Sequence, residues 1–119
     1  MPDPRYTRLA ETLIRYSCEV KPGDNVLIEA IDIPHEFTKE LVRVCAAAGG
    51  RPIVMLKSNE INRALMIAGT PEQWDLIAHV EKEQMERVQC YIGLRGNPNV
   101  SEISDVPNDK QKLYEQTVW

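Results

Sequence analysis

Apolar residues along this chain follow two patterns, short unbroken runs and stripes with helical spacing. Two consecutive runs, residues 26–31, which are apolar except for Glu29, and residues 53–56, have the length and composition of strands that are buried on both faces. A third strand is predicted for residues 88–94. Amphipathic segments separate these runs, and the order strand, helix, strand with short connections predicts βαβ units, whose strands are parallel.

Helical stripes mark the segments around the strands. In residues 3–17 the apolar side chains recur at i, i+3, i+4, i+7 and i+8, with Asp3 as N-cap and Pro4 in the first helical position. Further helices are predicted for residues 34–48, 59–68 and 71 onward. A capping box begins the last of these, but the charged run within it leaves its end open, either near residue 80 or at residue 87.

The predicted fold class is α/β, a small three-layer αβα domain with a three-stranded parallel sheet in the order 2-1-3 and helices on both faces. The first strand is placed at the centre because Glu29 alone interrupts its apolar run. The third strand contains Gln89 and Gly93, which suit an edge position. Residues 1–94 are predicted to form this αβ domain, and residues 95–119 a loop and a final helix.

The length and charge of the chain limit its class. With 119 residues, of which 43% are hydrophobic and 27% charged, it matches one soluble globular domain. The net charge of −4 disfavours nucleic acid or an anionic membrane as a partner. The N-terminal residues lack the apolar run of a signal peptide, so a cytoplasmic location is expected. Three widely spaced cysteines without a C-x-x-C motif are expected to be buried and reduced.

Motifs for self-contained catalysis are missing from the sequence. It has no P-loop and no G-x-G-x-x-G motif, and no serine lies in a G-x-S-x-G context. His35 and Glu36 begin a segment like H-E-x-x-H, but Lys39 replaces its second histidine. His79 and Glu83 share a helix face in a charged run that is typical of a solvated surface. We therefore predict no catalytic residue, no metal site and no cofactor bound by this chain.

Polar residues follow each strand where its apolar run ends. Glu29 and Asp32 lie at the end of the first strand, Lys57 follows the second and Asn97 the third. Because the carboxyl ends of parallel strands meet at one edge of the sheet, where ligands bind in such folds, these four residues are candidates for lining a crevice. Any parallel αβ sheet also places polar residues there, so a ligand site and a purely structural role both remain open.

Several phrases of the sequence resemble one enzyme family. They are LIRYS at 13–17, VKPGDNVLIE at 20–29, AGGRP at 48–52, YIGLRG at 91–96 with Asn99, and DVP at 105–107. Together they resemble the N-terminal domain of the metalloaminopeptidases typified by aminopeptidase T and the thermophilic leucyl aminopeptidases. The likeness covers nearly the whole chain, and residues 16–29 are its most specific part.

This resemblance implies a larger, dimeric, cytoplasmic enzyme that removes N-terminal residues from peptides with two divalent metal ions, zinc, cobalt or manganese. Its metal ligands would lie in a C-terminal catalytic domain, so no catalytic or metal residue is carried over to this chain, which alone is expected to be inactive. The expected partners are that C-terminal domain, a second copy in a homodimer and the peptide substrate. A helical pattern that reaches Trp119 without a C-cap suggests a fragment of such an enzyme.

The resemblance also changes the role expected of Glu29. In a non-catalytic domain that helps to form the substrate chamber or the dimer, Glu29 is expected to pair with Lys57 or Arg95, or to face the chamber, and not to act as a base. The alternative function is a free-standing αβ module that binds a small ligand or a protein. In that case Glu29, Asp32, Lys57 and Asn97 line its crevice.

Overall fold

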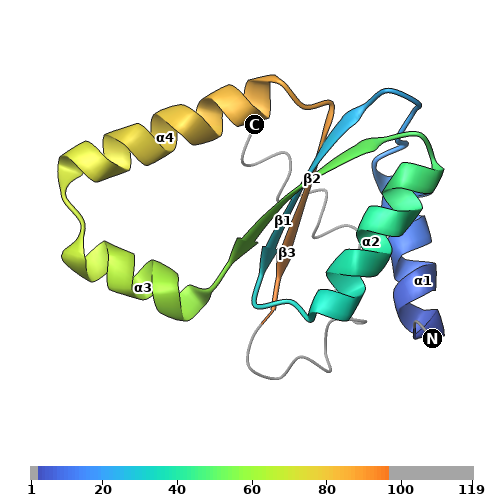
Figure 1. The fold of residues 1–119 in the computed structure, drawn as a ribbon, viewed down its shortest axis with the longest axis horizontal. Coiled ribbons are helices and arrows are strands. Elements are labelled where there is room, and N and C mark those ends of the chain that lie inside the picture. Colours follow the sequence, from blue (N-terminus) through green and yellow to red (C-terminus); the bar gives the residue numbers. More distant parts are fainter. Residues whose placement is uncertain (1–2, 97–119) are drawn as a thin grey trace.

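The fold is built on three parallel strands. The computed structural model describes residues 3–96. Along the chain the elements are α1 (Pro4–Glu11), the π-helix η1 (Thr12–Ser17), β1 (Asn25–Ile31), α2 (His35–Ala47), β2 (Arg51–Lys57), α3 (Asn59–Ala68), α4 (Pro71–Glu86) and β3 (Cys90–Arg95) (Figure 1). β1 pairs in parallel with both β2 and β3, which gives the order β2-β1-β3. The predicted α/β class and the 2-1-3 order are confirmed. The predicted final helix and Asn97 lie outside the described residues.

The main core lies between the sheet and the helices α1, η1 and α2. Ile28 and Ala30 of β1 point into this core, whereas Leu27 belongs to a smaller cluster on the opposite face. Phe37 of α2 is fully buried, and its ring meets that of Tyr6 edge to face with centroids 5.4 Å apart. Because apolar burial is the dominant favourable contribution to folding, this layer holds the sheet and the three helices together.

The N-terminal helix changes geometry along its length. Asp3 accepts a hydrogen bond from the Arg5 N–H at 2.8 Å and Pro4 follows it, as the sequence predicts. After Glu11 the helix widens into η1, and the N–H of Cys18 donates to the carbonyl of Leu13 at 2.9 Å. The stripe predicted for residues 3–17 is thus helical throughout, with a π-helical end that periodicity alone does not reveal.

Two glycines with positive φ shape the turns before β1 and β2. Gly23 has a φ of +89°, and the Asp24 N–H donates to the Lys21 carbonyl at 3.0 Å, which closes a tight turn. Gly49, with a φ of +90°, lies just after α2, and a Cβ atom there would lie 2.9 Å from Pro22. The Gly23 N–H donates to the Gly49 carbonyl at 2.9 Å, so the two turns are joined.

The helices α3 and α4 form an arm, residues 59–86, that extends away from the sheet (Figure 1). The far end of α4 returns to the sheet, where Met85 packs with Leu27, Val88 and Tyr91 on the face opposite α2. α4 runs without a break to Glu86, so of the two predicted ends of this helix, near residue 80 or at residue 87, the second is correct. No residue of α3 or α4 is fully buried, so the arm is attached chiefly at its two ends.

Candidate functional site

Glu29 carries its carboxylate on the sheet face opposite α1 and α2. Its neighbours Ile28 and Ala30 point into the main core, so the alternation of side chains along a strand directs Glu29 to the other face. It lies in register with Met55 of β2 and Gly93 of β3. The residue is only 8% exposed, and a carboxylate at that depth requires partners for its charge.

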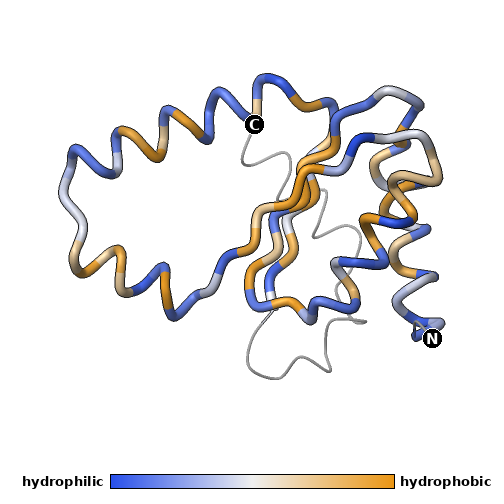
Figure 2. Tube along the Cα trace, viewed as in Figure 1, coloured by the Kyte–Doolittle hydropathy of each residue, from blue (hydrophilic) through white to orange (hydrophobic). Residues whose placement is uncertain are grey.

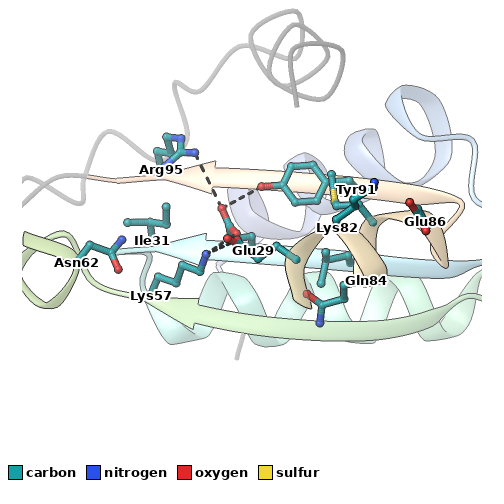
Figure 3. A pocket seen from close by; sticks show the side chains of 12 residues that line it. Glu29, Ile31, Lys57, Asn62, Lys82, Gln84, Glu86, Tyr91 and Arg95 are labelled. Atoms are coloured by element: carbon teal, nitrogen blue, oxygen red, sulfur yellow. Dashed lines mark hydrogen bonds and ion pairs between the residues drawn. The ribbon is translucent and has the colours of Figure 1, made fainter. Parts of the chain in front are cut away.

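Three side chains converge on this carboxylate (Figure 3). The Tyr91 hydroxyl donates a hydrogen bond to Oε1 at 2.9 Å, and Lys57 Nζ lies 3.0 Å from Oε2. A guanidinium nitrogen of Arg95 lies 4.0 Å from Oε1. The pairing expected of Glu29 with Lys57 or Arg95 is therefore present, and its contact with Lys57 is the closer.

Lys57 links the sheet to the arm. Its Nζ atom lies 3.0 Å from Glu29 Oε2 and 3.1 Å from Glu81 Oε2 on α4. Partial burial acts to lower the pKa of Lys57, but its hydrogen bonds to Glu29 and Glu81 outweigh that effect and raise the pKa above its usual value. Lys57 therefore stays charged at neutral pH and joins two carboxylates from different layers.

A cavity of about 570 Å³ lies beside this cluster, between the sheet and the arm (Figure 3). Its walls include Glu29, Lys57, Tyr91 and Arg95 from the strands, Asn62 from α3 and Glu81 from α4. These carboxylate, ammonium, guanidinium, phenol and amide groups give the cavity both donors and acceptors. Such a lining suits a polar ligand that carries donors and acceptors of its own.

The structure brings together two of the four residues predicted to line a crevice. Glu29 and Lys57 are in direct contact. Asp32 has a φ of +55°, and its carboxylate accepts a hydrogen bond from the N–H of Asn59 at 3.2 Å, at the start of α3. Asp32 is not among the residues that line the cavity described above. Asn97 lies outside the described residues.

Sequence reasoning missed two members of the cluster, Tyr91 and Glu81. The strand pattern identifies Tyr91 only as an apolar residue, although its place two residues before Gly93 puts it on the same face as Glu29 once the register is known. Glu81 falls in the charged run that predicts a solvated helix side. Its spacing of i+4 from Ile77 is the signal that places it on the inner face of the arm.

The described residues do not suit a metal ion. Between residues 3 and 96, no group of three or more histidine, cysteine, aspartate or glutamate side chains is arranged to hold one. Glu29 faces the cationic groups of Lys57 and Arg95, which would repel a divalent cation at its carboxylate. The two metal ions implied by the family resemblance therefore have no fitting ligand set in this part of the chain.

The cysteines behave as structural residues. Cys45 and Cys90 are buried, and Cys18 is partly buried. Burial raises the pKa of the Cys45 thiol to about 11, so the reactive thiolate is scarce at neutral pH. The prediction of buried cysteines is confirmed for Cys45 and Cys90, whereas Cys18 is only partly buried.

No membrane-spanning helix was found in the described part of the chain, where each helix is too short or too polar to cross a bilayer.

Comparison with known proteins shows which family this chain belongs to. Residues 3–118 match the family model of the thermophilic metalloproteases, M29. No curated protein sequence matches the chain. Among solved structures, wild-type AmpT from Thermus thermophilus is similar to it, with a TM-score of 0.64 at 16% sequence identity. The superposition covers 96% of this chain and 33% of AmpT, so the chain spans about a third of that protein's length. At this identity AmpT shows a shared fold, and the family match shows that the chain belongs to the thermophilic metalloprotease family M29.

Proposed function

We propose that this chain is the N-terminal, non-catalytic domain of a metal-dependent aminopeptidase that removes N-terminal residues from peptides. The observation that carries the proposal is the M29 match across residues 3–118, combined with a length about a third that of AmpT. The two catalytic metal ions would be bound by the remaining part of such a protein. In the proposal the whole enzyme is a cytoplasmic homodimer.

The face that carries Glu29 is proposed to form part of the wall of the substrate chamber. Glu29, Lys57 and Tyr91 hold one another in place through contacts of 2.9–3.0 Å, so their orientation is fixed before any ligand arrives. The cavity of about 570 Å³ next to them offers donors and acceptors to the main chain of a peptide. Such fixed polar groups position a substrate without taking part in bond cleavage.

The test compares the 119-residue chain with a longer protein in which the same domain is followed by the rest of the family's length. Both are assayed on aminoacyl amides with added cobalt, zinc or manganese. We expect turnover from the longer protein alone. Turnover by the 119-residue chain would show that the domain is catalytic and would refute the proposal.

Metal analysis of the longer protein gives a second test. Glu29→Gln is expected to change KM or stability and to leave the bound metal unchanged, because Glu29 is proposed to have no ligand role. Glu83→Gln is the matched control, since Glu83 of α4 forms an exposed ion pair with Arg87, the residue that follows the helix. Loss of metal in the Glu29 variant, but not in the control, would contradict the assignment of the metal ions to the rest of the protein.

A second candidate function, a free-standing binding module for a small ligand or a protein, is favoured by the charged cavity itself. It predicts that the 119-residue chain binds a polar ligand such as a dipeptide by calorimetry, and that Lys57→Met abolishes this binding. It also predicts that extending the chain adds no peptidase activity. Peptidase activity in the longer protein would contradict the binding module and support the aminopeptidase proposal.

A further inference from the structure

The two faces of the sheet differ in how the described helices cover them. On one face α1, η1 and α2 pack against β1 and β3 in the main core, and the central parts of all three strands are apolar (Figure 2). On the opposite face, which carries Glu29, the described residues form a smaller cluster, in which Met85 of the arm packs with Leu27, Val88 and Tyr91. The Glu29 face thus has less cover from the described helices than the face of the main core.

The strands β2 and β3 are both at an edge of the described sheet, yet they differ in burial on the Glu29 face. There β3 carries Tyr91, which is 3% exposed, and Gly93, which is buried. At the matching positions β2 carries Ile53, which is 38% exposed, and Met55, which is only partly buried. A covering element that lies over β3 and does not reach β2 would account for this difference.

The connections between the strands indicate where the chain goes after β3. α2 joins β1 to β2 on one face, and the arm joins β2 to β3 in the opposite direction on the other face, so the two crossovers have the same hand (Figure 1). Crossovers between parallel strands are right-handed in about 98% of cases. The same rule places a helix that leads from β3 to a further parallel strand beside it on the face of the arm, which is the Glu29 face.

The segment that follows β3 suits this position. Residues 109–118 are predicted to form a helix whose apolar side carries Leu113, Tyr114 and Val118. The twelve residues 97–108 before it span up to about 40 Å when extended, about twice the length of the six-residue strand β3. The helix can therefore return along β3. Because the segment is tethered, its effective concentration at the sheet is about millimolar, which favours it over a separate protein.

We propose that residues 109–118 dock as a helix on the Glu29 face of the sheet, over β3 and beside α4, with their apolar side toward the strands. That face supplies apolar partners, because Leu27, Ile31 and Met85 are part of the lining of the cavity of about 570 Å³. The docked helix forms a third wall of this cavity, after the sheet and the arm. The inference concerns contacts within this chain, so it stands or falls independently of any peptidase activity.

A nitroxide spin label on the segment tests which face it occupies. The label is attached to Lys112→Cys, which lies away from the apolar side of the predicted helix, in a 119-residue chain that also carries Cys18→Ser. Cys45 and Cys90 are buried and are not expected to react with the label. The label should broaden the amide resonances of α4 and leave those of α2 unchanged, because the sheet lies between α2 and the docked helix.

Two matched variants test the apolar contact. Leu113→Glu places a charge on the apolar side of the helix, and Gln116→Glu places the same charge outside that side. Hydrogen exchange reports the docking equilibrium through the protection of the amides of residues 109–118. Leu113→Glu should lower this protection at least ~10-fold, because the burial of a leucine side chain is lost. Gln116→Glu should leave it unchanged, and unaltered amide resonances of β1 and α2 check that both variants are folded.

Three results would overturn the proposal. Broadening of α2 in place of α4 would put the segment on the face of the main core. Absence of broadening in both helices would show that the segment does not dock on the sheet. Equal effects of Leu113→Glu and Gln116→Glu on hydrogen exchange would show that the apolar side of the predicted helix makes no contact.

Discussion

Replacing Glu29 by glutamine removes one charge from the second face of the sheet and keeps the size of the side chain. The native residue is 8% exposed, accepts a hydrogen bond from Tyr91 at 2.9 Å and lies 3.0 Å from Lys57. The amide oxygen can still accept a hydrogen bond, but glutamine cannot neutralise Lys57, and its NH₂ group needs an acceptor of its own. The variant should therefore have a lower free energy of unfolding.

The size of the loss follows from the burial of the pair. Removing one partner of a buried ion pair costs about 3–5 kcal/mol, because the other charge is left without compensation. The Lys57 side chain is 25% exposed and keeps Glu81 at 3.1 Å, so only part of that cost applies. The Tyr91 hydrogen bond also changes from a charged to a neutral acceptor, which costs about 1 kcal/mol. We expect a loss of about 2–3 kcal/mol at pH 7, or about 8–12 °C in Tm.

Urea unfolding followed by circular dichroism measures this loss. A double-mutant cycle with Tyr91→Phe should give a coupling free energy of about 1 kcal/mol between the two side chains. The exposed control Glu83→Gln should change the free energy of unfolding by less than about 0.5 kcal/mol. A Glu29→Gln variant as stable as this control would refute the view that the carboxylate holds the cluster together.

Two further predictions concern α2 and the turns. Hydrogen bonds from the Arg43 guanidinium and the Thr7 hydroxyl lower the pKa of Glu40 from 4.5 to about 2. The Glu40 carboxylate therefore contributes its full stabilisation at pH values above its pKa in the unfolded chain. That stabilisation is lost as the pH falls toward the lower pKa of the folded protein. Glu40→Gln should lower the free energy of unfolding by about 1–2 kcal/mol at neutral pH, and the variant should lose less stability on acidification than the native protein. The loss is no larger because the Arg43 side chain is 58% exposed. The exposed control Glu36→Gln should change neither property. In urea unfolding Gly49→Ala should destabilise more than Gly23→Ala, since both have a φ near +90° but only the Cβ at Gly49 meets a neighbour, at 2.9 Å; equal costs would contradict this.

The strands and their order could be predicted from the sequence, but the burial of β2 could not. The apolar run 53–56 predicts a strand buried on both faces, whereas Ile53, Val54 and Leu56 are exposed by 38%, 38% and 58%. The run from Val26 to Ile31 is buried throughout, and only a central strand is covered by neighbours on both edges as well as by helices. Lys57 ends β2, whereas Gln89, which is predicted to lie within the third strand, comes just before β3 begins at Cys90. Strand order therefore follows from apolar composition, together with the parallel direction that the βαβ connections impose.

The arm could not be predicted, because helical periodicity reveals which face is apolar but not what covers it. Ile61 and Leu65 on α3 and Ile77 on α4 have the spacing of helices that pack on a sheet. In the structure these residues line a groove of the arm instead. The position at which α4 ends could not be predicted for a related reason. A charged run such as 81–87 is compatible with a solvated helix surface, but it also interrupts the apolar stripe by which a helix is recognised.

The cluster around Glu29 could be predicted in part. The pair with Lys57 follows from the parallel register of β1 and β2, since both side chains lie near the carboxyl ends of neighbouring strands. Tyr91 and Glu81 depend on the register of β3 and on the rotation of α4, which no local pattern encodes. Asp32 contributes a hydrogen bond to Asn59 and not a wall of the cavity, because its positive φ redirects the chain after β1.

The weak attachment of the arm has a consequence for how the family can vary. α3 and α4 bury no residue completely, so for the folding of the sheet they act as one long loop between β2 and β3. The entropy of closing a loop grows slowly, by about 0.6 kcal/mol for each doubling of its length. The arm can therefore be lengthened, shortened or exchanged at little cost to the sheet. The core between the sheet and the helices α1 and α2 contains no residue of the arm, so it would stay unchanged.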